Sequence, residues 1–271
     1  MASILQPILR PLLSSVVTDT RHALSQGGGF SPSQLFAASE PGFWYDPSDL
    51  TSMYQGRTGT TAAAVGSPVG QILDKSGNDN HAVAVSDAGR AILRQSGSLY
   101  YLEYDGVDDG YVTPTITPGT DKVQVFAGVR KLGSGGMIAE TSAAAGGNNG
   151  SAYILAATET YAVRSGGTAF ATPTTGATFA APSTNVLTGL GDISGDRATL
   201  RVDGAQVAQS TADQGTGNYL AYPLYIGRRG GTSLPFNGYE YGLIVRFGPN
   251  LDAATLAKAE AYMARKTGVT L

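Results

Sequence analysis

Between residues 98 and 247 the sequence alternates short strand-like stretches with glycine-containing turns, and this pattern most constrains how the chain can fold. The stretch 123–129 (VQVFAGV) is rich in β-branched and apolar residues, which favour strands. Asp203-Gly204 separates two more such stretches and suits the two-residue turn of a β-hairpin. The other strands are expected at 98–104, 152–156, 160–164, 198–202, 206–209, 222–227 and 239–247. This spacing predicts an all-β fold, a two-sheet antiparallel jelly-roll sandwich.

The composition agrees with a β-rich domain and argues against several classes of function. Glycine occurs 37 times and only 14% of the residues are charged, the opposite of a disordered chain. A net charge of −3 argues against an electrostatic nucleic-acid-binding surface. The chain has no cysteine and two histidines. Disulfides and zinc–thiolate sites are therefore excluded, and little remains for a histidine-based metal cluster or triad.

Residues 1–29 are expected to form an arm ahead of a single domain at 30–271. Apolar pairs recur every four positions, which is a helical pattern, although Pro7 and Pro11 disfavour a helix that includes both. We therefore expect a helix from about residue 11 to residue 26, ended by three glycines. The paired apolar residues are Ile4, Leu5, Ile8, Leu9, Leu12, Leu13, Val16 and Val17.

A single helix cannot bury its own apolar side, so this arm needs a partner. One alternative is that it packs back on the domain. The other is that it anchors the protein to another chain or joins copies into a trimer or dimer; disorder is the third. The segment lacks the positive start of a signal peptide, and Arg10 interrupts its apolar stretch. No uninterrupted apolar run in the chain is long enough to predict a membrane span.

One helix is expected at the C-terminal end. Asn250 is the expected N-cap, with Asp252 in the first turn, and Gly268 is the expected stop. The apolar stripe, which we expect to pack on the rim of the sandwich, consists of Leu251, Leu256, Ala259 and Met263.

Three further stretches have local signals. Residues 31–37 are expected to make a short helical turn, and the aromatic run 43–45 a strand followed by a helix-capping turn at Asp46-Pro47. The Gly/Ala-rich stretch 133–150 is expected to be a hairpin or a loop.

Three stretches in order carry a family resemblance. They are 35–50 (LFAASEPGFWYDPSDL) with 59–82, then 103–112 (EYDGVDDGYV), then 236–271. Together they resemble the concanavalin A-like, laminin-G-type jelly-roll modules of tailed-phage and prophage virion proteins, over about residues 35–271. The resemblance implies a two-sheet sandwich carried on the surface of a phage particle made in the bacterial cytoplasm. It also implies binding to a host-surface glycan or to another virion protein.

The first polar cluster is Glu103-x-Asp105-x-x-Asp108. Retaining glucanases of this fold carry two carboxylates on one strand face, and such a pair must lie about 5–5.5 Å apart. Here Gly106 signals a turn, so we favour a turn in which Asp105 and Asp108 accept hydrogen bonds from backbone amides over a role in hydrolysis. Calcium is the third alternative, with Asp105, Asp108 and Asp109 as ligands.

For the other candidate residues a purely structural role is an alternative to a functional one. Trp44 could stack on a sugar, but its aromatic neighbours favour burial in the core. The polar stretch 74–81 is typical of a self-hydrogen-bonded loop, with His81 structural rather than catalytic. Arg228 and Arg229 lie between two strands and could contact an anionic glycan or a neighbouring subunit, or form a solvated tip.

The favoured hypothesis is a virion structural protein without enzymatic activity, either a tail fibre or spike or another attachment protein. Its lectin-like domain would bind glycan or a neighbouring virion protein, and residues 1–29 would anchor it. The alternatives are a capsid decoration or head-fibre protein that binds no glycan, and a polysaccharide depolymerase.

Overall fold

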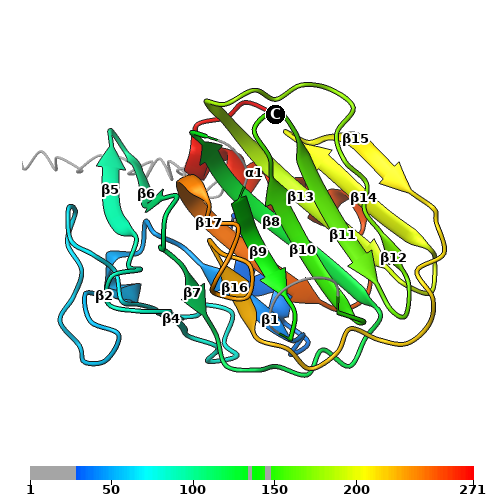
Figure 1. The fold of residues 1–271 in the computed structure, drawn as a ribbon, viewed down its shortest axis with the longest axis horizontal. Coiled ribbons are helices and arrows are strands. Elements are labelled where there is room, and N and C mark those ends of the chain that lie inside the picture. The colour runs from blue at the N-terminus through cyan, green and yellow to red at the C-terminus, as the bar shows by residue number, and fades with distance from the viewer. Residues whose placement is uncertain (1–28, 134–135, 144–147) are drawn as a thin grey trace, which may run out of the picture.

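A computed structural model of the chain describes residues 29–133, 136–143 and 148–271. The expected helix at 11–26 and all eight arm residues that could anchor the protein lie outside this range. Over the described residues the chain forms two antiparallel sheets packed face to face, with one α-helix near the C-terminus (Figure 1). The expected all-β sandwich is therefore confirmed.

The eight-stranded sheet runs in the order β15-β14-β13-β8-β17-β6-β5, with β1 also paired to β17. Its strands are β1 (Gly42–Tyr45), β5 (Ile92–Ser96), β6 (Leu99–Asp105), β8 (Lys122–Lys131), β13 (Ser183–Asp192), β14 (Arg197–Val202), β15 (Ala205–Ser210) and β17 (Asn237–Phe247). Because β17 lies between β8 and β6, the C-terminal strand is central to this sheet.

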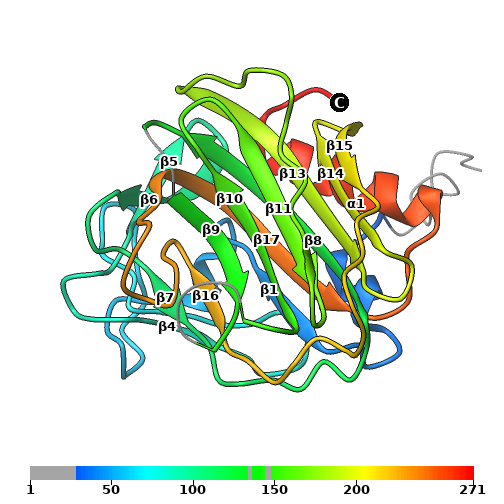
Figure 2. The same cartoon turned by 45° about the vertical axis from the view of Figure 1, so that its right-hand side comes forward.

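The nine-stranded sheet runs in the order β12-β11-β10-β9-β16-β7-β4-β3-β2. Its strands are β2 (Met53–Tyr54), β3 (Gln71–Ile72), β4 (Ala82–Ala84), β7 (Tyr111–Val112), β9 (Gly136–Thr141), β10 (Ser151–Ala156), β11 (Tyr161–Gly166), β12 (Phe170–Ala171) and β16 (Leu224–Ile226). Figure 2 shows β9, β10, β11 and β16 on one side of the sandwich, with α1 (Ala253–Thr267) away from them. Two 3-10 helices, η1 (Pro32–Phe36) and η2 (Leu50–Ser52), complete the described elements.

Alternation along the strands builds the core between the sheets. In β8, Val123, Val125, Ala127 and Val129 belong to the main buried cluster, whereas Phe126 packs in a second cluster with residues of α1. Successive side chains of a strand point to opposite faces, so one strand contributes to both clusters. A sandwich of this size needs no disulfide to hold its core.

Helix α1 differs from the expectation at its start and in its packing. Asp252, not Asn250, is the N-cap, because its side chain accepts a hydrogen bond from the Thr255 amide. Ala259 and Met263 are buried in the cluster that also holds Phe126 and Ile244, so the helix covers the outer face of the eight-stranded sheet rather than the rim. Gly268 ends the helix with φ +76°, a left-handed conformation that glycine adopts without strain.

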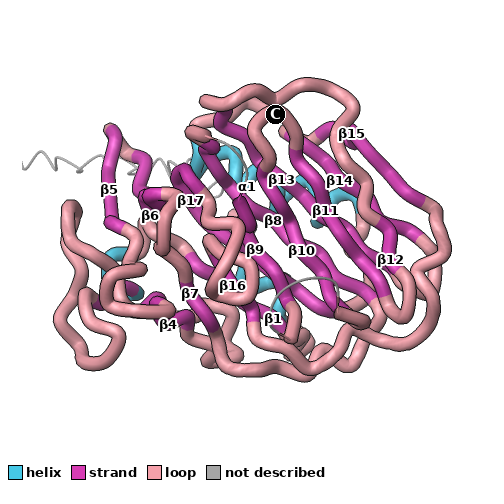
Figure 3. The backbone as a smooth tube through the Cα atoms, in the orientation of Figure 1, coloured by secondary structure: helices cyan, strands magenta, loops and turns pink. Residues whose placement is uncertain are grey.

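The remaining local expectations have mixed outcomes. The turn at 31–37, the strand at 43–45 and every strand expected between 98 and 247 are confirmed, although β16 is shorter than expected. Asp49, not Asp46, caps the short helix that follows β1. The stretch 133–150 contains strand β9, which was expected only as part of a hairpin or loop, and β13 was not expected at all. Figure 3 shows how much of the chain around β2 and β4 is loop.

Among the described residues, no helix combines the length and the apolar character that crossing a membrane requires.

Candidate functional site

The aspartates of the 105–109 turn lie together at the end of β6. One carboxylate oxygen from each of Asp105, Asp108 and Asp109 lies within 4.8 Å of the others. Asp105 Oδ1 accepts a hydrogen bond from the Val107 amide at 2.7 Å, and Asp109 Oδ2 accepts one from the Asp105 amide at 2.9 Å. The turn is therefore held by side-chain-to-backbone bonds as expected, with Asp109 in the role expected of Asp108.

Burial raises the pKa of Asp109 to about 6, and the neighbouring carboxylates of Asp105 and Asp108 add to this effect. Glu103, on the strand before the turn, pairs with Arg94 at 2.6 Å. Carboxylate oxygens are suitable ligands for calcium, but that ion takes six to eight oxygen ligands in all, and two carboxylate oxygens of the turn already accept bonds from its own amides. Calcium at this turn stays a prediction.

Trp44 lies in the core. Trp44 is only 8% exposed, and the Tyr262 ring meets its ring edge-on, with the ring centres 6.2 Å apart. Lys75 Nζ lies 4.8 Å from the Trp44 ring centre. The burial that we favoured is confirmed, and Trp44 is not part of the candidate site.

The loop at 74–81 holds itself together. Asp74 accepts hydrogen bonds from the amides of Trp44, Ser76 and Asn80. His81 Nδ1 accepts one from the Asp74 amide at 3.1 Å, so this histidine has the structural role that we expected.

Arg228 and Arg229 are neighbours with different roles. Arg228 donates to the Asp108 carbonyl oxygen at 3.0 Å and to that of Thr232 at 2.9 Å, which ties its loop to the 105–109 turn. Arg229 instead reaches Glu140 on β9, with Nε 3.3 Å from Oε1. Arg228 thus positions its loop, whereas Arg229 extends over a face of the nine-stranded sheet.

That strand face is the outer side of the nine-stranded sheet. In direct register, Arg164 of β11 stands opposite Tyr153 of β10, Tyr153 opposite Glu140 of β9, and Glu140 opposite Tyr225 of β16. Their strand neighbours Val163, Ile154, Ala139 and Leu224 belong to the core cluster, so this row points outward. With Phe170 and Arg229 these four residues form what we call the arginine–tyrosine face.

Aromatic rings fix the arginines of this face. The guanidinium carbon of Arg164 lies 3.5 Å from the Phe170 ring centre and 5.9 Å from that of Tyr153. The guanidinium carbon of Arg229 lies 5.2 Å from the Tyr153 ring centre. Tyr153 therefore lies between two cations, an arrangement favoured by the negative face of an aromatic ring.

Glu140 is the acidic member of the arginine–tyrosine face. It is 1% exposed, and its oxygens make no hydrogen bond of good geometry to the described residues. Burial raises the pKa of Glu140 to about 7, while the charges of Arg229 and Arg164 act in the opposite direction. The group is thus poised to change charge near neutrality.

Arginine, tyrosine and phenylalanine are the residue types enriched in recognition surfaces. A tyrosine offers both an apolar ring and a hydroxyl, and an arginine offers a planar fork of donors. Of the six residues that define the face, Glu140 alone carries a carboxylate, whereas glycoside hydrolysis uses a pair. The residue types of the face are therefore those of a recognition surface.

Sequence reasoning found Arg229 and missed the other five residues of the face. Glu140 lies in the stretch expected to be a hairpin or loop, so its strand neighbours could not be aligned. Tyr153 and Arg164 do alternate with small or apolar residues in their strands, which is the available signal for outward-facing positions.

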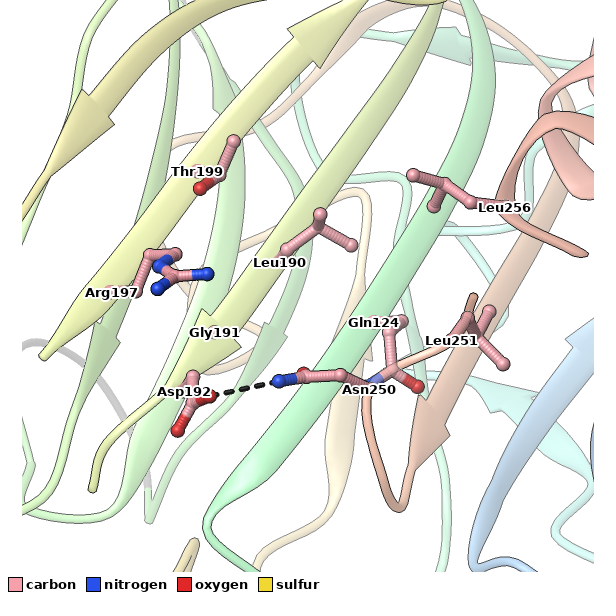
Figure 4. Close-up of a pocket in the computed structure, with 9 residues that line it drawn as sticks. All are labelled: Gln124, Leu190, Gly191, Asp192, Arg197, Thr199, Asn250, Leu251 and Leu256. Atoms are coloured by element: carbon pink, nitrogen blue, oxygen red, sulfur yellow. Dashed lines mark hydrogen bonds between the residues drawn. The ribbon is translucent and has the colours of Figure 1, made fainter. Parts of the chain in front are cut away.

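A second feature is a hollow of about 160 Å³ on the other sheet, beside the start of α1 (Figure 4). Arg197 and Thr199 lie on one side of it and Leu251 and Leu256 on the other. At its end Asn250 donates to Asp192 at 2.8 Å. Small-molecule pockets usually measure about 300–1,000 Å³, so this hollow is small for a ligand site.

Comparison with solved structures shows the same fold in other proteins. A structure described as "Cell entry of botulinum neurotoxin type C is dependent upon interaction with two ganglioside molecules" matches with a TM-score of 0.53 and 11% identity, over 71% of this chain and 48% of that one. An arabinofuranosidase complexed with arabinofuranosyl-alpha-1,2-xylobiose matches with a TM-score of 0.59 and 13% identity, over 88% and 65%. The binding domain of botulinum neurotoxin DC in complex with SialylT matches with a TM-score of 0.52 and 9% identity, over 71% and 48%.

This chain thus spans about half to two thirds of the length of these structures. At such low identity the likeness shows the β-sandwich fold, and a fold by itself does not define a function. No protein-family model matches the sequence, and no curated protein matches it. The association with tailed-phage proteins stays a prediction from the sequence resemblance.

Proposed function

We propose that this chain is a carbohydrate-binding protein without catalytic activity and that the arginine–tyrosine face holds the glycan. The observation that carries the proposal is the outward row Arg164, Tyr153, Glu140 and Tyr225, which four neighbouring strands hold in register. Strands position side chains more rigidly than loops do, so little conformational entropy is lost when a ligand binds.

The fold supports this proposal at a coarser level. Structural neighbours include toxin binding domains described with gangliosides or SialylT and an arabinofuranosidase described with an arabinofuranosyl xylobiose. Proteins that share this fold are thus described with sugars in two settings, a neurotoxin and an arabinofuranosidase. The two outer faces of this sandwich differ, because α1 packs on the eight-stranded sheet.

The proposed setting is the surface of a phage particle, as a tail or attachment protein, and its support is the sequence resemblance over residues 35–271. Residues 1–29 would anchor the protein to other virion proteins or join copies into a trimer or dimer. Mass spectrometry of particles purified from the phage or prophage that encodes the chain tests this setting. Absence of the chain from intact particles would contradict it.

Glycan binding is tested by incubating the full chain with an array of bacterial polysaccharides and oligosaccharides. We expect binding to a subset of glycans, without new reducing ends in solution. Release of new reducing ends would show a depolymerase instead. Binding to empty capsids but to no glycan would favour a capsid decoration protein.

A further inference from the structure

Arg164 is the one cation of the arginine–tyrosine face without an ion-pair partner among the described residues. Arg229 has Glu140 at 3.3 Å, whereas no carboxylate of the described residues lies within ion-pair distance of Arg164. The Nε atom of Arg164 is buried and has no hydrogen-bond partner there. Burial lowers the pKa of Arg164, which reflects the cost of holding its charge away from water.

A buried donor without a partner is costly and calls for an explanation. Packing alone explains the position of this side chain, because its guanidinium lies over Phe170 at 3.5 Å. Packing does not explain why the Nε donor has no hydrogen-bond partner or why the charge has no ion-pair partner among the described residues. A ligand that supplies an anionic acceptor to the guanidinium provides a counter-ion for this charge when it binds.

The geometry favours a planar anion. Stacking on Phe170 fixes the plane of the Arg164 guanidinium, and a fixed guanidinium presents parallel N–H donors to a carboxylate. Next to it the Tyr153 ring, 5.9 Å from the Arg164 guanidinium carbon, offers an apolar surface to a sugar ring. Glu140, opposite Tyr153 in register, is buried, so it acts on a bound ligand through its charge and through Arg229 rather than by direct contact.

We propose that the glycan bound by the arginine–tyrosine face is acidic and that Arg164 receives a carboxylate of one of its sugars. This inference rests on the proposed function, because it names the ligand class of the same face. Tyr153 supports the sugar ring, and the buried Glu140 acts through its charge. Arg229 keeps Glu140 in place beside the ring.

The test uses a panel of carboxylated polysaccharides: polygalacturonate, alginate, hyaluronate and polysialic acid. Each is paired with its carboxyl-reduced form, which has the same backbone without the charge, and dextran sulfate serves as a control for charge alone. We expect the full chain to bind at least one carboxylated member at least about tenfold more tightly than its reduced partner. Dextran sulfate should bind more weakly than that member.

Two variants localise the effect. Arg164→Gln should weaken binding of the carboxylated member by about tenfold or more and weaken binding of its reduced partner much less. Arg164→Lys keeps the charge but loses the forked donors of the guanidinium. Its affinity for the carboxylated member should lie between that of the unchanged protein and that of Arg164→Gln. Arg265→Gln is the matched control, since Arg265 also lies over a tyrosine ring, Tyr262 at 5.8 Å, but on the exposed side of α1.

Each outcome decides between the two proposals. Equal binding of carboxylated and reduced partners, or binding of neutral glycans only, overturns the acidic-glycan inference and leaves glycan binding standing. Equal loss in Arg164→Gln and Arg265→Gln, or equal binding of dextran sulfate, shows general charge attraction and also overturns it. No binding to any glycan of this panel or of the array overturns the proposed function and the inference together.

Discussion

The guanidinium carbon of Arg164 lies 3.5 Å from the centre of the Phe170 ring, although the two residues belong to different strands at the edge of the nine-stranded sheet. This contact sets the plane of a cation that has no ion-pair partner among the described residues. The contact is local, because β12 follows β11 in the chain and pairs with it. The other residues of the arginine–tyrosine face depend on the pairing of β9, β10, β11 and β16.

Tyr153 should be the main stacking residue of the face. We expect Tyr153→Ala to weaken glycan binding by about tenfold, because central aromatic residues dominate recognition surfaces. Thermal stability should change little, since the side chain is half-buried on an outer face. Titration calorimetry checks the first expectation. Tyr239→Ala, which removes a tyrosine stacked on Tyr101 at 4.3 Å, is the control; the same loss there would contradict a local role.

Glu140 should make binding of an acidic glycan depend on pH. Its pKa is raised to about 7, so between pH 8 and pH 6 it gains a proton. An anion nearby favours the protonated form, and linkage then requires affinity to rise as the pH falls through this range. Sugar carboxylates stay ionised in this range. The other titratable groups around Glu140 are Arg164, Arg229, Tyr153 and Tyr225.

Glu140→Gln removes this titration. The variant should bind the acidic glycan with nearly constant affinity from pH 8 to pH 6, measured at fixed ionic strength. An affinity that falls with decreasing pH in the unchanged protein would refute this arrangement of charges around the bound glycan.

Glu240 should limit stability at high pH. It is 1% exposed on β17, its oxygens have no hydrogen-bond partner among the described residues, and burial raises its pKa to about 8. In the unfolded chain its pKa is near the ordinary 4.5. The folded state therefore binds more protons between these values, and stability falls as the pH rises from about 4.5 to about 8, by up to about 1.4 kcal/mol per pH unit.

Denaturant unfolding at several pH values checks this slope. Glu240→Gln keeps the shape and removes the charge, so its stability should be less dependent on pH and higher than that of the unchanged protein at pH 8. Parallel pH profiles for the two proteins would show that another group causes the slope.

The 105–109 turn should be stable without metal. Because Asp105 and Asp109 already accept backbone hydrogen bonds, we expect the same melting temperature in calcium chloride and in EDTA. A rise in calcium that Asp108→Asn abolishes would instead identify Asp105, Asp108 and Asp109 as ligands.

Removal of residues 1–29 should separate assembly from folding. The two sheets of the described domain form a large buried cluster of their own, so the truncated protein should remain folded by circular dichroism. Analytical ultracentrifugation should then show a lower oligomeric state than that of the full chain. An unchanged oligomeric state would mean that the domain, and not the arm, holds the copies together.

The sequence was sufficient to predict the sandwich because most strands are local and strongly patterned. Asp203 and Gly204, for example, both have positive φ, as a tight hairpin turn requires. Strand β13 escaped prediction because Gly189 and Gly191 lower its strand propensity. The structure gives the reason: a Cβ at position 189 would lie 2.7 Å from a methyl group of Val163 on the facing sheet.

The arginine–tyrosine face could not be predicted in the same way. Glu140 and Tyr153 lie on consecutive strands, but Tyr225 is distant in the chain, and only pairing of β9 with β16 brings it beside Glu140. Long-range pairing of this kind has no local signature. The aspartates at 105–109 were visible in the sequence because they are close together in the chain, but they serve mainly to build a turn.

A crystal structure of the full chain with the acidic glycan that binds most tightly would locate the binding site directly. We expect a sugar ring over Tyr153, with its carboxylate on the Arg164 guanidinium. A glycan bound in the hollow beside α1, or at the 105–109 turn, with the arginine–tyrosine face empty, would contradict the proposed site.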